Sequence, residues 1–201
     1  MSKNIFKVAK WMVTAIIVAY VALVIYRIPH AIEQKKTDQA VAKIHATKLT
    51  LDDVMGKNLP PDPGALADQT IAGVDANQNG IRDDVELAVF KAYPNSARTR
   101  AVLLQYALAL QMEMTQDMVN TETVTAVAED GDTALNCLWS ISSRSNMKKF
   151  LNETSQNEKF VKSRQINTTA RDRFEKDFYT KLGSYMSPNA GCYVNLSTLP
   201  N

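Results

Sequence analysis

The sequence contains few of the residues from which enzymes build their common catalytic centres. Histidine occurs only as His30 and His45, and both lie in a polar segment near the N-terminus. We therefore expect the folded domain to have no imidazole for a general base, a catalytic triad or a zinc site. The sequence also has no Gly-x-Ser-x-Gly, no Cys-x-x-Cys and no glycine-rich phosphate loop. These absences make catalysis the less favoured class of function.

One long uncharged run is present near the N-terminus. Residues 11–26 carry no charge, and Thr14 is the only side chain there that is neither apolar nor aromatic. As a helix the run spans about 24 Å, slightly less than a bilayer core of about 30 Å. Four residues at its ends suit a membrane interface: Lys10, Trp11, Tyr26 and Arg27. The run is a transmembrane helix or a signal peptide.

We interpret residues 11–28 as an uncleaved anchor in the lipid bilayer, preceded by a short cytoplasmic tail, residues 1–10. A cleaved signal needs small residues at its cleavage site, whereas residues 26–31 are mostly bulky or charged. Basic residues lie on both sides of the run, so the positive-inside rule leaves the orientation open.

The segments after the anchor change in composition. Residues 29–49 are polar with a narrow apolar stripe, which predicts a helical stalk. Residues 50–74 begin with Thr50-x-x-Asp53, a capping motif for a short helical turn that ends near Gly56. Several prolines follow and predict an extended loop segment.

The remaining chain, residues 75–201, has apolar residues at a spacing of three to four, which predicts a small helical bundle. The expected helices cover residues 85–93, 97–119, 120–128, a segment from Asp132, 146–161 and 168–182, the last closed by Gly183. The helix over 97–119 is apolar on nearly every face and is the expected central helix. Residues 184–201 predict an irregular tail. The expected fold class is mostly α, without a strand ladder or an internal repeat.

Residues 75–86 read Asp-Ala-Asn-Gln-Asn-Gly-Ile-Arg-Asp-Asp-Val-Glu. Calcium takes about six to eight oxygen ligands, which a 12-residue loop supplies from positions 1, 3, 5, 7, 9 and 12. Gly80 occupies position 6, where the chain must bend sharply. The pattern predicts a Ca²⁺ site with these ligands: Asp75, Asn77, Asn79, the carbonyl of Ile81, Asp83 (directly or through a water) and Glu86.

The Asp-x-Asn-x-Asn-Gly-Ile-x-Asp core resembles the EF-hand-like calcium loops of bacterial secreted and surface proteins, including thrombospondin type 3 repeats and dockerins. The resemblance covers residues 75–86 only, so it implies a calcium site and neither the fold nor the activity of those families. Arg82 stands at position 8, where an EF-hand has an aliphatic residue, and no second copy occurs. A lone loop favours a structural staple over a sensor. The alternative is a metal-free, Asn- and Asp-rich turn that caps the next helix.

The loop and the cysteines together indicate the compartment. Three carboxylates, two neutral amides and a nearby arginine predict a calcium dissociation constant of about 10⁻⁵ to 10⁻³ M, which suits a compartment rich in free calcium. Cys137 and Cys192 are the only cysteines, and a pair suits an oxidising compartment. Two free thiols in a cytoplasmic domain are the alternative. We expect a disulfide and a single-pass inner-membrane protein, with a cytoplasmic N-terminus and a periplasmic domain.

Charge is unevenly distributed along the chain, with most acidic residues in the middle and many basic residues after Cys137. No aromatic residues alternate with the basic ones, so a nucleic-acid partner is not expected. The anchor, the stalk and the stapled domain favour a non-catalytic interaction, scaffold or inhibitor module that binds a protein of the cell envelope. Two alternatives stay open: a calcium-responsive signalling module, and an envelope hydrolase that uses carboxylates such as Asp83, Asp84 or Glu113.

Overall fold

The computed structural model describes the backbone of residues 2–200 and the side chains of residues 5–200. It is mostly helical (69%), and the described residues form no strand, as the sequence predicts. The chain divides into two compact units, Met1–Gln39 and Ala40–Asn201.

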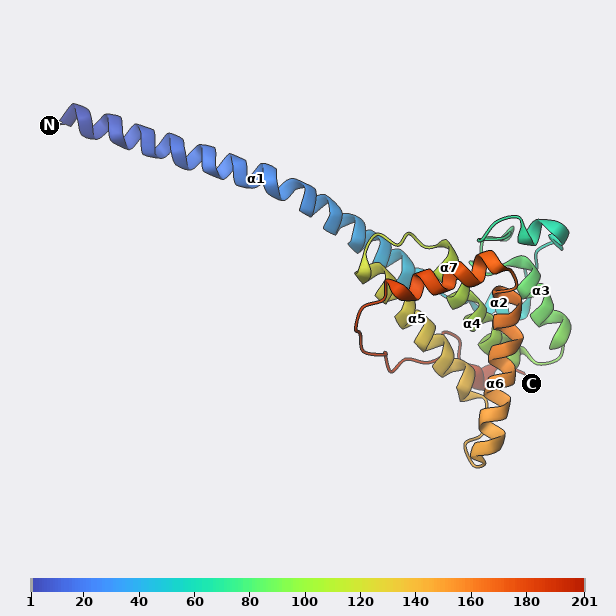
Figure 1. Cartoon of the computed structure of the whole chain (residues 1–201). Coiled ribbons are helices and arrows are strands. Elements are labelled where there is room, and N and C mark those ends of the chain that lie inside the picture. Colours follow the sequence, from blue (N-terminus) through green and yellow to red (C-terminus); the bar gives the residue numbers. More distant parts are fainter. Residues whose placement is uncertain (1, 201) are drawn as a thin grey trace. The chain divides into compact units, whose positions relative to one another are not determined.

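The first unit is the greater part of helix α1 (Ser2–Ala46), which continues through Pro29 without a break (Figure 1). Within α1 lies one segment that is long and apolar enough to cross a membrane. Its large side chains are exposed, for example Trp11 at 76% and Tyr26 at 81%. Thr14, its one polar residue, donates its hydroxyl proton to the carbonyl of Lys10 at 2.9 Å. Because that hydrogen bond stays within the helix, the segment suits a lipid environment.

The second unit is a helical bundle around a central helix, α4 (Figure 1). Every residue of α4 from Arg100 to Met114 is buried, as expected for the segment that is apolar on nearly all faces. Helices α2, α3, α5, α6 and α7 all pack against it. The elements of this unit are α2 (Leu51–Met55), the 3₁₀ turn η1 (Gly64–Asp68), α3 (Asp83–Ala92), α4 (Ala97–Thr115), α5 (Thr121–Ser140), α6 (Met147–Gln165), α7 (Thr169–Thr180) and the 3₁₀ turn η2 (Leu196–Thr198).

The predicted break between residues 128 and 132 is wrong, because α5 runs unbroken through Gly131. Glycine inside a helix costs about 1 kcal/mol relative to alanine. Buried residues continue on both sides of Gly131, with Val127 before it and Cys137 and Leu138 after it. Burial of this continuous apolar face outweighs the local cost. Helix α7 ends at Thr180 with Lys181 as its C-cap, so Gly183 does not close that helix as expected.

The predicted capping motif of α2 is confirmed. Thr50 and Asp53 form a reciprocal capping box, and the helix ends at Gly56 with a left-handed φ of 70°. A Cβ at position 56 would lie 2.7 Å from a ring carbon of Phe90, so the turn requires glycine.

The predicted disulfide is also confirmed. Cys137 on α5 bonds to Cys192, 55 residues further along the chain. The tail is irregular, as expected, and additional hydrogen bonds attach it to the bundle. The amide of Tyr193 donates to Oε1 of Gln105 at 2.9 Å, and its hydroxyl donates to Oδ1 of Asp130 at 2.6 Å.

The second unit begins at Ala40, before the end of the segment expected as a stalk. Ile44, near the end of α1, is fully buried and belongs to the core, as does Leu49 just beyond the helix. Nδ1 of His45 lies 3.4 Å from Oδ2 of Asp130 on α5. The expectation that the folded domain contains no histidine is therefore wrong. The apolar side chains of Ile44 and Leu49, on either side of His45, are buried in the core, so the end of α1 belongs to the folded domain.

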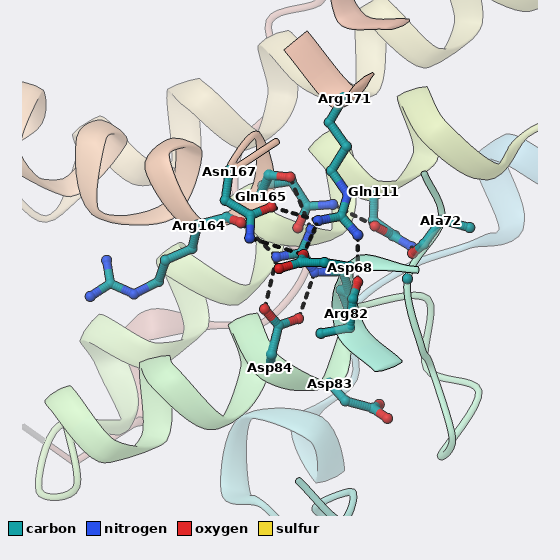
Figure 2. Close-up of polar contacts among 12 residues, drawn as sticks. Asp68, Ala72, Arg82, Asp83, Asp84, Gln111, Arg164, Gln165, Asn167 and Arg171 are labelled. Carbon is teal, nitrogen blue, oxygen red and sulfur yellow. Dashed lines mark hydrogen bonds and ion pairs between the residues drawn. The ribbon is translucent and has the colours of Figure 1, made fainter. Parts of the chain in front are cut away.

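Two fully buried arginines join distant parts of the bundle (Figure 2). Arg82 donates to both carboxylate oxygens of Asp84, at 2.5 and 2.8 Å, and to the carbonyls of Gln165 (3.0 Å) and Arg164 (2.6 Å). Those carbonyls end α6 and have no partner within that helix. Arg171 on α7 similarly donates to the carbonyls of residues 67, 70 and 71, and pairs with Asp68.

The position of Arg82 depends on a close backbone approach at Gly73. Gly73 has a φ of 71°, and a Cβ there would lie 2.4 Å from Cδ of Arg82. Only glycine adopts this conformation readily and leaves room for the arginine stem.

We predict that Arg82→Leu destabilises the second unit by about 3 kcal/mol, because two buried carbonyls and Asp84 lose their donor. Urea unfolding of the full chain in a neutral detergent measures the change. Arg173→Leu is the matched control, since Arg173 is exposed on α7. Equal stabilities of the two variants would contradict the role assigned to Arg82.

Candidate calcium site

The predicted calcium loop lies between η1 and the first turn of α3. Asp83 and Glu86 are on that turn, whereas the other predicted side-chain ligands precede it. The amide of Asp83 donates to the carbonyl of Val74 at 2.9 Å, which closes the loop at its base. Gln78 and Gly80 have positive φ angles of 59° and 83°, so the chain bends sharply where the sequence predicts it.

Side-chain oxygens of the predicted ligands hold the bend from inside. Asp75 accepts hydrogen bonds from the amides of Asn79 (3.2 Å) and Gly80 (2.9 Å). Oδ1 of Asn79 accepts from the amide of Ile81 at 2.9 Å. A Cβ at position 80 would lie 2.7 Å from Cδ1 of Leu108, which explains the glycine there. The sequence thus folds locally into a loop with its side-chain oxygens on the inner side.

Two of the predicted ligands are buried carboxylates. Asp83 is fully buried and Glu86 is 1% exposed. Asp83 accepts from the amide of Ala76 with both oxygens, at 3.0 and 3.1 Å, and Oε2 of Glu86 accepts from Nδ2 of Asn77 at 3.1 Å. Within residues 5–200, neither carboxylate forms an ion pair with a lysine, arginine or histidine. Their negative charge has no cation to balance it.

The surroundings raise the pKa of both groups. Burial raises the pKa of Glu86 to about 7, and the nearby carboxylates of Asp53 and Asp83 add to this effect, whereas the amide of Asn77 opposes it. Burial also raises the pKa of Asp83, and the charges of Asp75 and Asp84 add to it. A bound divalent cation would reverse this unfavourable balance.

Arg82 does not reduce the negative charge inside the loop as its position suggests. Its guanidinium pairs with Asp84 and faces the end of α6, while Asp83 points away from it (Figure 2). The side chains of the consecutive residues Arg82 and Asp83 therefore point in different directions, which keeps the arginine away from the candidate ligand.

The oxygen donors of residues 75–86 would suit a hard cation only if the carboxylates, the amides and the backbone carbonyl all took part. In the part of the chain that is described, no three histidine, cysteine, aspartate or glutamate side chains gather into a metal-binding group. The carboxylates therefore need the amides of Asn77 and Asn79 and the carbonyl of Ile81 to complete six oxygen donors. Oδ1 of Asn79 is already held by the amide of Ile81, and its buried Nδ2 has no hydrogen-bond partner among the described residues. These residues fit calcium in number and kind.

The other carboxylates considered for catalysis lie in separate surroundings. Asp84 pairs with Arg82, and Asp83 belongs to the loop. Glu113 on α4 is 3% exposed, and its Oε1 accepts from the hydroxyl of Tyr179 at 3.0 Å. Burial raises the pKa of Glu113 to about 7, with a further contribution from Glu175. The structure does not bring these three acids together.

No known family model, curated protein or solved structure matches this chain.

We predict that Glu86→Gln stabilises the protein in chelator and removes most of the stabilisation that calcium gives the wild type. In chelator at pH 8 the variant should be more stable than the wild type by up to about 3 kcal/mol, because the buried charge is gone. With calcium at about 100 times its dissociation constant the wild type gains about 2.7 kcal/mol. The variant should gain far less, which thermal melts of the full chain will show. Glu122→Gln, an exposed glutamate in the first turn of α5, is the control.

We predict that Glu113 makes the protein less stable as the pH rises from about 4.5 to 7. Its folded-state pKa lies above the ordinary value of 4.5, so the folded protein binds the proton more tightly than the unfolded chain does. Glu113→Gln should make this part of the profile less steep, with the remaining slope coming from Glu86, and add up to about 3 kcal/mol at pH 8. Urea unfolding in chelator across this pH range tests it. The surface variant Glu153→Gln should keep the wild-type slope, and an unchanged slope in Glu113→Gln would contradict the prediction.

Proposed function

We propose that this chain is a single-pass inner-membrane protein with a cytoplasmic N-terminus and a periplasmic domain. Its domain binds Ca²⁺ through residues 75–86 and acts as a non-catalytic interaction, scaffold or inhibitor module of the cell envelope. The observation that carries the calcium assignment is the burial of Asp83 and Glu86, which form no ion pair with a basic side chain within residues 5–200. Buried carboxylates are paired, protonated or bound to metal, and the Asn-rich loop beside them supplies further oxygen donors.

The position of the loop supports a structural role for the ion. The loop joins the segment before it to α3, and Arg82 within it caps α6. An ion that fixes the loop therefore also fixes Arg82 and the helix packing beyond it. This arrangement favours a staple, because opening the loop would remove buried hydrogen bonds from two helices.

The apolar segment of α1 and the disulfide support the proposed location. A segment of this length and composition suits a bilayer. The bond between Cys137 and Cys192 suits an oxidising compartment such as the periplasm. A calcium site of modest affinity suits the same side of the membrane.

The surface of the second unit supports a binding role. Large apolar side chains are exposed on it, including Leu51, Met55 and Leu66 near the calcium loop in sequence, and Met147 and Leu151 at the start of α6. Asp83, Asp84 and Glu113 are each engaged in their own hydrogen bonds. The exposed apolar side chains and the engaged carboxylates therefore fit recognition better than hydrolysis.

We predict that alkaline phosphatase fused after Asn201 is active in cells and that green fluorescent protein fused there is dark. Both results follow from a periplasmic C-terminus, because phosphatase needs its disulfides and fluorescent protein fails to fold after export. In intact envelopes Cys137 and Cys192 should resist alkylation until a reductant is added. The opposite fusion pattern, or free thiols in native envelopes, would contradict the location.

The binding role is tested by photocrosslinking in cells. A photoreactive residue placed at Met55 or Leu151 should give a discrete adduct with an envelope protein, and one at Lys181, directly after α7, is the comparison. Loss of the adduct in Glu86→Gln would link it to the calcium loop. Absence of any adduct at every exposed apolar position would contradict the interaction role.

A further inference from the structure

A cavity of about 640 Å³ in the second unit lies against the calcium loop. The end of α1 and the segment after it contribute one part of the wall, including Lys43 and Lys48. The loop contributes Asp75, Asn77 and Asn79, and α4 closes the remainder. The candidate calcium site therefore opens onto a space large enough for a ligand of several residues.

The loop faces this cavity with only part of its donor set. Asp75, Asn77 and Asn79 line the cavity, whereas Asp83 and Glu86 do not and are buried behind the loop. An ion held by all five side chains would be approachable from the cavity side alone. Calcium accepts about six to eight ligands, so an oxygen atom from a bound molecule can complete its coordination there.

The balance of charge around the cavity would depend on whether an ion is bound. Two lysines, Lys43 and Lys48, stand against two aspartates, Asp53 and Asp75, so the wall without the ion has no excess charge. Both aspartates are engaged: Asp53 accepts from the amide and hydroxyl of Thr50, and Asp75 accepts from loop amides. The lysines form no ion pair within residues 5–200, and Lys48 only stacks over Tyr193, 5.1 Å from its ring centroid. A divalent ion bound there would offset two of the three negative charges of Asp75, Asp83 and Glu86, so that the two lysines can attract an anion.

We propose that this cavity binds a carboxylate from an acidic, extended segment of a partner protein. The carboxylate completes the coordination of the calcium ion in the loop, and further acidic groups of the segment pair with Lys43 and Lys48. The proposal rests on the calcium site of the proposed function and identifies the chemistry of the partner. A protein segment fits better than a lone anion because the cavity far exceeds the volume of one carboxylate.

Binding of the ion and binding of the acidic segment are coupled. Whatever factor calcium adds to the affinity for the segment, the segment adds to the affinity for calcium. Magnesium should substitute poorly, because it keeps its waters and demands a smaller octahedral site.

The test uses the full chain in a neutral detergent and a fluorescein-labelled octapeptide of alternating glutamate and serine. Fluorescence anisotropy should show binding in calcium, and affinity should fall by about tenfold or more in chelator or in magnesium. The matched peptide with glutamine in place of glutamate should bind at least about tenfold more weakly. Equal binding of the acidic peptide in calcium and in chelator would overturn the proposal.

Substitutions of the cavity lysines test whether the peptide binds in the cavity. The double variant Lys43→Gln/Lys48→Gln should weaken peptide binding by about tenfold, since two charge-assisted contacts are lost. Lys57→Gln/Lys181→Gln is the control, because both lysines are exposed, pair with acids and lie outside the cavity. Equal losses in the two double variants would overturn the cavity assignment.

Two further measurements separate the possible failures. A calcium-dependent rise in melting temperature without peptide binding would overturn this inference and leave the calcium site standing. No rise, together with no calcium binding by calorimetry, would overturn both. An oligogalacturonate that binds in calcium where the acidic peptide does not would assign the cavity to an acidic glycan and overturn the proposed partner.

Discussion

The buried guanidinium of Arg82 is the contact on which the arrangement of the second unit depends. It lies between the loop and the end of α6, where it supplies donors to two helix-terminal carbonyls and is balanced by Asp84. Its neighbours in the chain face other surroundings. Ile81 before it is fully buried in the core, and Asp83 after it points to the other side. Three consecutive residues thus tie the loop to the core, to α6 and to α3, so a change in the shape of the loop would disturb contacts with the bundle.

This coupling explains why a cation in the loop would act on stability more than on shape. The folded chain already holds the bend through hydrogen bonds from Asp75 and Asn79 to backbone amides. What remains unfavourable is the burial of Asp83 and Glu86 as charged groups. A divalent ion removes that cost without requiring a new backbone path. A calcium sensor needs two conformations that the ion selects between, and a preformed loop with an internal arginine clamp opposes the second one.

Local patterns in the sequence were sufficient to predict the elements that are stabilised by contacts between residues close in sequence. Helical spacing located the central helix, the Thr50 capping box was readable from two residues, and the bend at Gly80 followed from the loop pattern. Contacts between distant segments were not readable in this way. A buried arginine has the same sequence signature as an exposed one, so the role of Arg82 was hidden. Glycine has a low helix propensity, so Gly131 indicated a break in the helix. Burial of apolar residues before and after it in α5 outweighed that preference.

The end of α1 shows how tertiary packing changes the meaning of a polar segment. By composition, residues 29–49 form a stalk, yet Ile44 is fully buried in the core of the second unit. Ile44 and Leu49 lie in this core and Val41 packs against it. This packing places Lys43 at the wall of the cavity and His45 beside Asp130. Residues 75–80 form the other wall. An ion bound by residues 75–86 would change the charge on that side, so the electrostatic character of the cavity would depend on occupancy of the loop rather than on movement of either wall.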